Sequence, residues 1–90
     1  MEKNYKLQYS KGFINQIKKM DPFVQKNIMS WLEVNIQNTN NPRKYGKALK
    51  GNLIGTWRYR IGNYRVICVI ADDKLIVLAL GVGHRNKIYK

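Results

Sequence analysis

The chain has 90 residues, enough for one domain with a modest core, and we expect that domain to span residues 1–90. Its 17 Lys and Arg against 5 Asp and Glu give a net charge of +12, which favours a polyanionic partner such as nucleic acid or an acidic protein. A single cysteine excludes an intrachain disulfide, and no apolar run reaches the ~20 residues of a membrane helix, so we expect a cytoplasmic protein with no membrane partner.

The first half of the chain predicts a short strand followed by two helices. Apolar and polar residues alternate from Tyr5 to Tyr9, which is the period of a strand. Ser10 is placed to cap the first helix, and Asp21-Pro22 to begin the second. Apolar residues at helical spacing form a core-facing stripe on each helix: Phe13, Ile14, Ile17 and Met20 on the first, and Val24, Ile28, Trp31, Leu32 and Ile36 on the second.

The second half predicts a basic loop, a hairpin and a last strand. Residues 43–52 indicate a loop, and the hairpin turns at Gly62-Asn63, where both residues tolerate positive φ. After a turn at Asp72-Asp73, the apolar run from Leu75 to Val82 lacks alternation, which predicts a central strand covered at least in part on both faces. Cys68 lies in an apolar run and is expected to be buried and inert. The order β-α-α-β-β-β predicts an α+β domain with two helices on one face of a small, mainly antiparallel sheet.

The hairpin carries the most informative side chains. With its turn at Gly62-Asn63, Arg60 faces Arg65 across the hairpin, and Arg58 shares their face because residues two apart point the same way. Like charges opposite each other destabilise a sheet. Three arginines on one face therefore indicate a surface that binds an anion, with a solvated outer face as the alternative.

Several kinds of site lack the residues they need. One His, one Cys and no clustered carboxylates argue against a metal, and no glycine fingerprint for a phosphate or dinucleotide is present, so we expect no cofactor. The remaining set, arginines beside His84 and several tyrosines, suits RNA cleavage by the 2′-hydroxyl of the bound RNA. Arginine stays protonated. Proton transfer is left to His84, Tyr89 or a loop lysine, whereas His84 as a packing residue and Tyr89 as a base-stacking or packing residue are the alternatives.

These motifs, in this order, resemble the RelE/ParE superfamily, the toxins of type II toxin–antitoxin pairs. The matching segments cover nearly the whole chain: the helical hairpin, the loop Gly46–Gly51, the strand Trp57–Ile61, then Tyr64–Val66 and Gly83–Arg85. The resemblance implies a RelE-like microbial RNase fold. It is strongest to the RelE branch, whose members enter the ribosomal A site and cut mRNA with the 2′-hydroxyl as nucleophile.

The resemblance also implies the site residues. Arg58, Arg60, Arg65, His84, Arg85 and Tyr89 match catalytic positions of the RelE branch, and Lys44, Lys47, Lys50 and Lys87 are the expected RNA-binding cations. Where RelE-type sites often carry lysines on the second strand, this chain has arginines, which shifts proton transfer toward His84 and Tyr89. No carboxylate stands in the loop where certain relatives place a glutamate base.

Three functions follow as hypotheses. The first is a ribosome-dependent endoribonuclease that binds the ribosome, its rRNA and mRNA, and the alternative is a ParE-like inhibitor of DNA gyrase without chemistry of its own. A third is a basic RNA-binding module with no activity. Both toxin hypotheses imply a cognate antitoxin, for which an acidic, partly disordered segment would complement the charge of +12.

Overall fold

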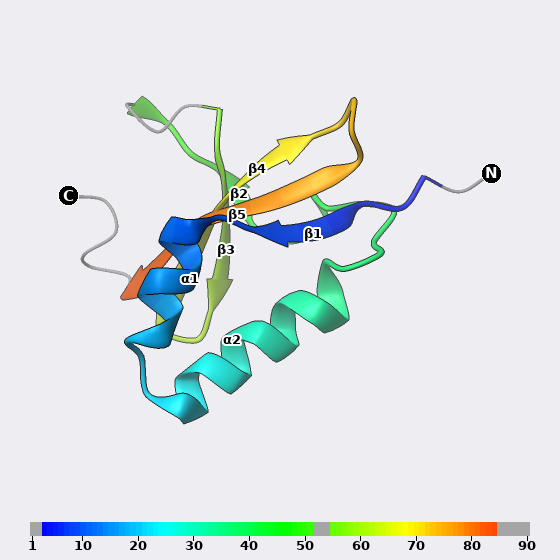
Figure 1. Cartoon of the computed structure of the whole chain (residues 1–90). Coiled ribbons are helices and arrows are strands. Elements are labelled where there is room, and N and C mark those ends of the chain that lie inside the picture. The colour runs from blue at the N-terminus through cyan, green and yellow to red at the C-terminus, as the bar shows by residue number, and fades with distance from the viewer. Residues whose placement is uncertain (1–2, 52–54, 85–90) are drawn as a thin grey trace.

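The computed structural model describes residues 3–51 and 55–84 of the chain. Its elements are β1 (Lys6–Tyr9), α1 (Lys11–Lys18), α2 (Pro22–Asn35), β2 (Lys47–Ala48), β3 (Trp57–Ile61), β4 (Tyr64–Ala71) and β5 (Ile76–His84). The strands form one sheet in the order β1-β5-β4-β3-β2, in which β1 and β5 run parallel and the other neighbours antiparallel (Figure 1). The predicted α+β fold, two helices on a mainly antiparallel sheet, is confirmed.

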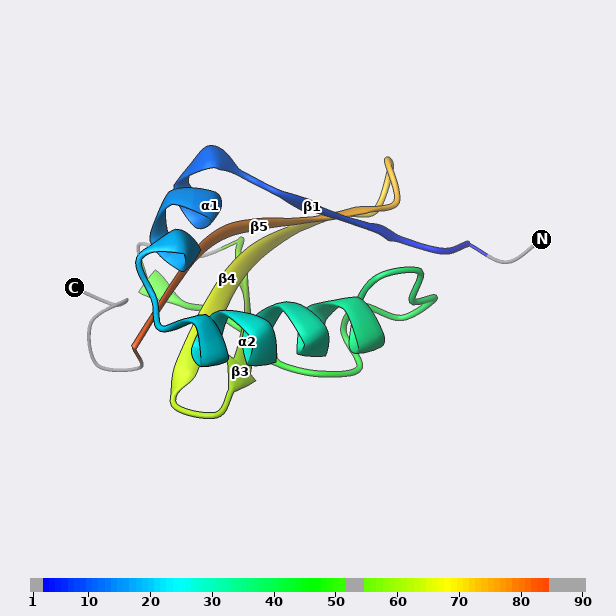
Figure 2. The same cartoon turned by 60° about the horizontal axis from the view of Figure 1, so that its bottom comes forward.

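Both helices begin where their capping residues predict. The Ser10 hydroxyl accepts a hydrogen bond from the Phe13 amide at 3.1 Å, and the Asp21 carboxylate accepts one from the Phe23 amide at 2.7 Å. Pro22 occupies the first turn of α2, where its missing N–H costs nothing. α1 packs beside β5, and α2 runs past β3 (Figure 2). None of the helices in the described part of the chain is long and apolar enough to cross a membrane.

The core lies between the two helices and one face of the sheet. Its buried members come from every layer: Tyr5, Phe13, Ile17, Ile28, Leu32, Ile36, Tyr59, Ile61, Val66, Cys68, Val77, Ala79 and Val82. β5 lies between β1 and β4 and is therefore central, as predicted, although Leu80 on it is 37% exposed. Burial raises the pKa of the Cys68 thiol to about 12, which keeps it protonated and inert.

The predicted loop over residues 43–52 needs one correction. Lys47 and Ala48 form β2, which pairs with the edge of β3 so that Lys47 lies opposite Arg58. Gly46 makes this approach possible, because it has φ +85 and a Cβ there would collide with the Arg58 carbonyl oxygen. The Trp57 indole N–H fixes the loop by donating to the Tyr45 carbonyl at 2.7 Å. A strand of two residues has no alternation, so the sequence carried no signal for it.

The turn at Asp72-Asp73 is confirmed, and Asp72 ties together three distant segments there. Both terminal nitrogens of Arg43 donate to the two carboxylate oxygens of Asp72 at 2.9 Å, and the Tyr5 hydroxyl donates to the same carboxylate at 2.6 Å. These hydrogen bonds, that of Arg43 foremost, lower the pKa of Asp72 to about 2. We call Tyr5, Arg43 and Asp72 the Asp72 clamp. It joins the start of β1, the loop after α2 and the turn between β4 and β5.

Candidate functional site

The hairpin of β3 and β4 brings the predicted arginines together. Arg60 lies opposite Arg65, as expected from the turn at Gly62, which has φ +59. Arg58 shares their face by strand alternation, and Lys47 joins it because β2 places that lysine directly opposite Arg58. We call Lys47, Arg58, Arg60 and Arg65 the cationic face. The sequence predicted the arginine part of this cluster from the register alone.

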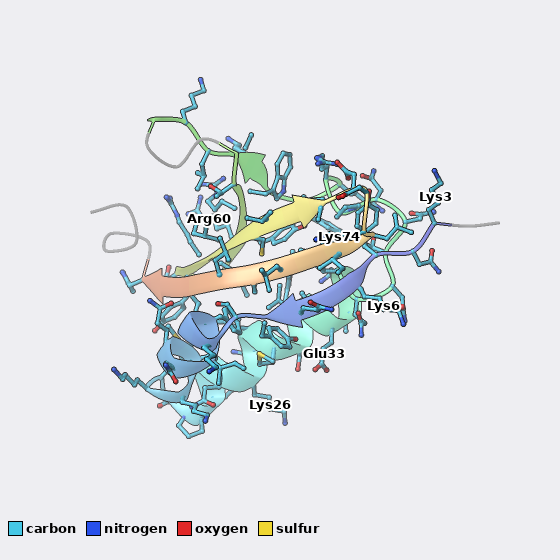
Figure 3. All side chains as sticks on the ribbon, turned by 45° about the horizontal axis from the view of Figure 1, so that its top comes forward. Lys3, Lys6, Lys26, Glu33, Arg60 and Lys74 are labelled. Carbon is cyan, nitrogen blue, oxygen red and sulfur yellow. The ribbon has the colours of Figure 1, made fainter. Side chains whose placement is uncertain are left out.

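The cationic face lies on the side of the sheet turned away from the helices. Tyr59 and Ile61 alternate with the arginines of β3 and are 0% and 9% exposed within the helix-side core. Figure 3 shows Arg60 beside the strands, well apart from Lys26 and Glu33, which project from α2. Helix-side burial of one set of side chains therefore forces the arginines onto the opposite surface.

An apolar residue lies beside the arginines on this face of the sheet. Ile67 lies opposite Arg58 and two residues after Arg65, and only 7% of it is exposed although it is not part of the helix-side core. Arg58 and Arg65 are themselves half-buried, whereas Arg60 is exposed. The aliphatic stems of arginine readily cover such a side chain while the guanidinium stays at the surface.

Arg58 and Arg60 have no acidic partner in the part of the chain that the structure describes. The buried Nε of Arg58 has no hydrogen-bond partner among residues 3–51 and 55–84, and the ion pair found in those ranges joins Arg43 to Asp72 instead. A guanidinium without an acidic partner keeps its full charge, which an anion can offset by charge-assisted hydrogen bonds to its exposed atoms. The guanidinium fork matches the oxygens of both phosphate and carboxylate, so the cationic face suits a phosphate-bearing ligand or an acidic segment.

His84 lies on the other side of the sheet from the cationic face. At the end of β5 it pairs with Tyr64, and its ring meets that of Tyr64 edge-on with 5.6 Å between centroids. Tyr64 faces Ile61 on the helix side, and the residue opposite Arg65 is Gly83. A histidine one residue further along the strand points to the other side of the sheet. The register therefore separates His84 from the cationic face.

The remaining predicted residues divide into two groups. Lys44 and Lys50 are exposed on either side of β2, and the Lys44 ammonium lies 5.7 Å from the centre of the Tyr45 ring. Arg85, Lys87 and Tyr89 fall outside the described residues, so their expected roles stay predictions. The described ranges contain no group of three His, Cys, Asp or Glu side chains that could hold a metal ion.

Two hollows next to the hairpin were not predicted from the sequence. A hollow of about 350 Å³ opens at the edge of β3, and its lining consists of Trp31, Tyr45, Gly46, Lys47, Arg58 and Arg60. A larger groove of about 570 Å³ lies between α2 and the hairpin turn, with Val24, Trp31, Val34 and Ile61 among its lining residues. Trp31 borders both. The sequence did not reveal these roles: the helical spacing of Trp31 indicated only a core position, and Tyr45 lay in a predicted loop without a periodic pattern.

Comparison with known proteins agrees with this fold. Residues 7–89 match the model of the family described as "ParE toxin of type II toxin-antitoxin system, parDE". A segment of 52 residues is 38% identical to Toxin RelG of Mycobacterium tuberculosis, and that match spans 58% of this chain and 60% of RelG.

Solved structures extend the likeness to nearly the whole chain. The toxin–antitoxin complex RelBE2 from Mycobacterium tuberculosis superimposes with a TM-score of 0.82 and 26% identity over 91% of this chain and 92% of that one. The isolated Escherichia coli RelE toxin superimposes with a TM-score of 0.70 and 20% identity, over 94% of this chain and 90% of that one, which shows the shared fold. The chain therefore belongs to the ParE toxin family of type II toxin–antitoxin systems, within the RelE/ParE superfamily.

Proposed function

We propose that this toxin is an endoribonuclease that cuts mRNA on the ribosome through the 2′-hydroxyl of the RNA. The observation that carries the proposal is the cationic face, in which Arg58 and Arg60 have no acidic partner in the described part of the chain. Such a reaction needs the 2′-oxygen in line with the departing 5′-oxygen and cations around the phosphorane-like transition state. Arginines on adjacent strands supply fixed positive charge without titrating at neutral pH.

Proton transfer needs groups other than the arginines, which stay protonated. Lys47 is a titratable side chain that the strand register places on the same face as the arginines. Tyr89 and Arg85 are further members of the proposed site by family resemblance, and they lie outside the described residues. Because His84 lies beside Tyr64 on the helix side of the sheet, our proposal gives it a packing role and leaves proton transfer to the other groups.

A cognate antitoxin is the second part of the proposal. The RelBE2 structure and the intact Escherichia coli RelBE structure are both toxin–antitoxin complexes. A chain with 17 basic and 5 acidic residues attracts an acidic segment, and such a segment can neutralise the cationic face while it orders on binding.

The proposal is tested in a cell-free translation reaction in which message 5′ ends are mapped with ribosomes and without them. New ends should appear only with ribosomes, and Arg65→Ala should remove them. Lys26→Ala is the matched control, because Lys26 is an exposed cation on α2, on the helix side of the sheet. Equal cleavage by wild type, Arg65→Ala and Lys26→Ala would contradict the site.

Gyrase inhibition is the competing function. We consider it because the matched family is described as ParE toxin. A supercoiling assay with purified gyrase separates the two functions. Inhibited supercoiling without RNA cleavage would support gyrase inhibition. RNA binding without inhibition or cleavage would instead indicate an RNA-binding module with no activity.

A further inference from the structure

The hollow at the edge of β3 combines two aromatic rings with three cations. Its rings belong to Trp31 and Tyr45, which meet edge-on with 5.5 Å between centroids. Lys47, Arg58 and Arg60 of the cationic face form the rest of its wall together with Gly46. Tyr45 is 38% exposed, so part of this residue is accessible to a ligand. Flat aromatic surface next to positive charge is the combination that holds a nucleotide, since the base stacks and the phosphate pairs.

The backbone, rather than the Tyr45 ring, keeps the hollow in place. The Tyr45 carbonyl accepts the indole N–H of Trp57, and Gly46 fits against β3 only because it lacks a Cβ. Trp31 is anchored from the core side, where its ring lies 5.5 Å from that of Tyr59. β2 pairs with Trp57 and Arg58, and no other strand among residues 3–51 and 55–84 covers the rest of that edge of β3. Truncating Tyr45 therefore removes a ring without removing the support of the loop.

We infer that this hollow binds one unpaired base of an RNA whose phosphates lie on the cationic face. The inference rests on the proposed function only in taking RNA as the bound polyanion. The base lies against Tyr45 and reaches the edge of Trp31, while Arg58, Arg60 and Lys47 hold the adjoining phosphates. Because every base has a π-face, stacking of this kind tolerates different sequences.

The neighbouring groove between α2 and the hairpin turn is a poorer place for the base. Its lining is mainly apolar and contains no cation among the described residues, with Val24, Ile28 and Val34 on the helix and Ile61 on the hairpin. A nucleotide there would bring its phosphate to a surface without positive charge. The hollow at Tyr45 is where aromatic and cationic side chains coincide.

The test is the affinity of the purified protein for a short single-stranded RNA, measured by fluorescence anisotropy at one fixed salt concentration because such binding depends on salt. Tyr45→Ala should weaken binding about tenfold, the usual effect of removing a stacking ring. Tyr45→Phe keeps the ring and should bind like wild type. Phe23→Ala is the matched control, since Phe23 is another exposed aromatic, 71% accessible, at the start of α2.

A second RNA of the same length, with abasic nucleotides in place of the bases, separates stacking from charge. The affinity of wild type should be about tenfold lower for the abasic RNA than for the intact RNA, whereas Tyr45→Ala should bind both RNAs equally. If Tyr45→Ala binds intact RNA as tightly as wild type does, or weakens both RNAs by the same factor, the inference is wrong. Base-dependent binding through Tyr45 in a protein that cuts no message on ribosomes would sustain the inference and refute the proposed nuclease.

Discussion

Arg43 and Arg58 occupy opposite kinds of surroundings in the same small protein. Arg43 donates twice to Asp72 at 2.9 Å, whereas the buried Nε of Arg58 has no hydrogen-bond partner in the described ranges. The chain has few acidic residues, 5 in all, and the Asp72 clamp uses one of them far from the hairpin turn. One arginine therefore joins segments of the fold, whereas the other has no acidic partner in the described ranges.

The two regions also differ in what they contribute to stability. Both partners of the Arg43–Asp72 pair are about half exposed, with 44% and 55% of their side chains accessible, so solvent screens the attraction. Arg60 and Arg65 repel each other directly across the hairpin. Replacing either arginine would relieve this repulsion. The two charges therefore do not stabilise the fold, which is consistent with a role in binding.

The largest expected effect separates these two roles. Arg60→Ala should lower the rate of ribosome-dependent cleavage about a hundredfold, or ~3 kcal/mol, because one contact to the transition state is lost. Its thermal midpoint should not fall, since the repulsion with Arg65 is relieved. Arg43→Ala should show the reverse, a lower midpoint and normal cleavage by folded protein. Cleavage assays and thermal melts of both variants test this difference. Equal losses of cleavage in Arg60→Ala and Arg43→Ala would show that the two arginines do not have separate roles.

The loop that carries Arg43 has a second anchor in the core. The Tyr59 hydroxyl donates to the Pro42 carbonyl, and Tyr59 is fully buried. Tyr59→Phe leaves that carbonyl without its partner and should reduce the free energy of unfolding by about 1–3 kcal/mol. Urea unfolding measures the loss. Cleavage per folded molecule should stay at the wild-type level, and a fall in cleavage at full folding would place Tyr59 in the site.

Lys47 tests how far the cationic face extends toward the sheet edge. Lys47→Ala should reduce the slope of log affinity against log salt for RNA by about one, the effect of one lost phosphate contact. Lys26→Ala, a cation on α2, should leave the slope unchanged. Titrations at several salt concentrations measure both slopes, and identical slopes for Lys47→Ala and wild type would remove Lys47 from the binding surface.

The Asp72 clamp predicts a dependence of stability on pH. The pKa of Asp72 is lowered in the folded protein to about 2, below its usual value of ~3.9. Its contribution is therefore fully present above about pH 4 and is lost as the pH falls toward 2. Asp72→Asn should lower the thermal midpoint slightly at pH 6, and the difference from wild type should shrink on acidification. A difference that is constant with pH would mean that the carboxylate charge contributes nothing.

The smallest effect is expected at His84. Because its ring contacts Tyr64 on the helix side of the sheet, His84→Ala should leave the cleavage rate nearly unchanged and lower stability slightly. The rates of wild type and His84→Ala should be measured at several pH values. A large loss of rate, together with a changed pH profile, would return His84 to the role of base.

Local patterns in the sequence determined much of the architecture. The caps at Ser10 and Asp21 and the turn at Gly62-Asn63 were all predicted, because each depends on residues within a few positions of one another. The register of Arg60 with Arg65 followed from the turn, and strand alternation then placed Arg58 beside them. The sequence by itself therefore determined the arginine part of the cationic face.

Pairing between distant segments was decided only in three dimensions. The two residues of β2 are too few for a pattern, yet their pairing with β3 brings Lys47 to Arg58 and Tyr45 to Trp31. The face on which His84 lies depends on its alignment with Tyr64, and the approach of Arg43 to Asp72 joins parts of the chain 29 residues apart. A local sequence pattern is silent about such contacts, because their free energy comes from the packing of elements that meet only after the chain has folded.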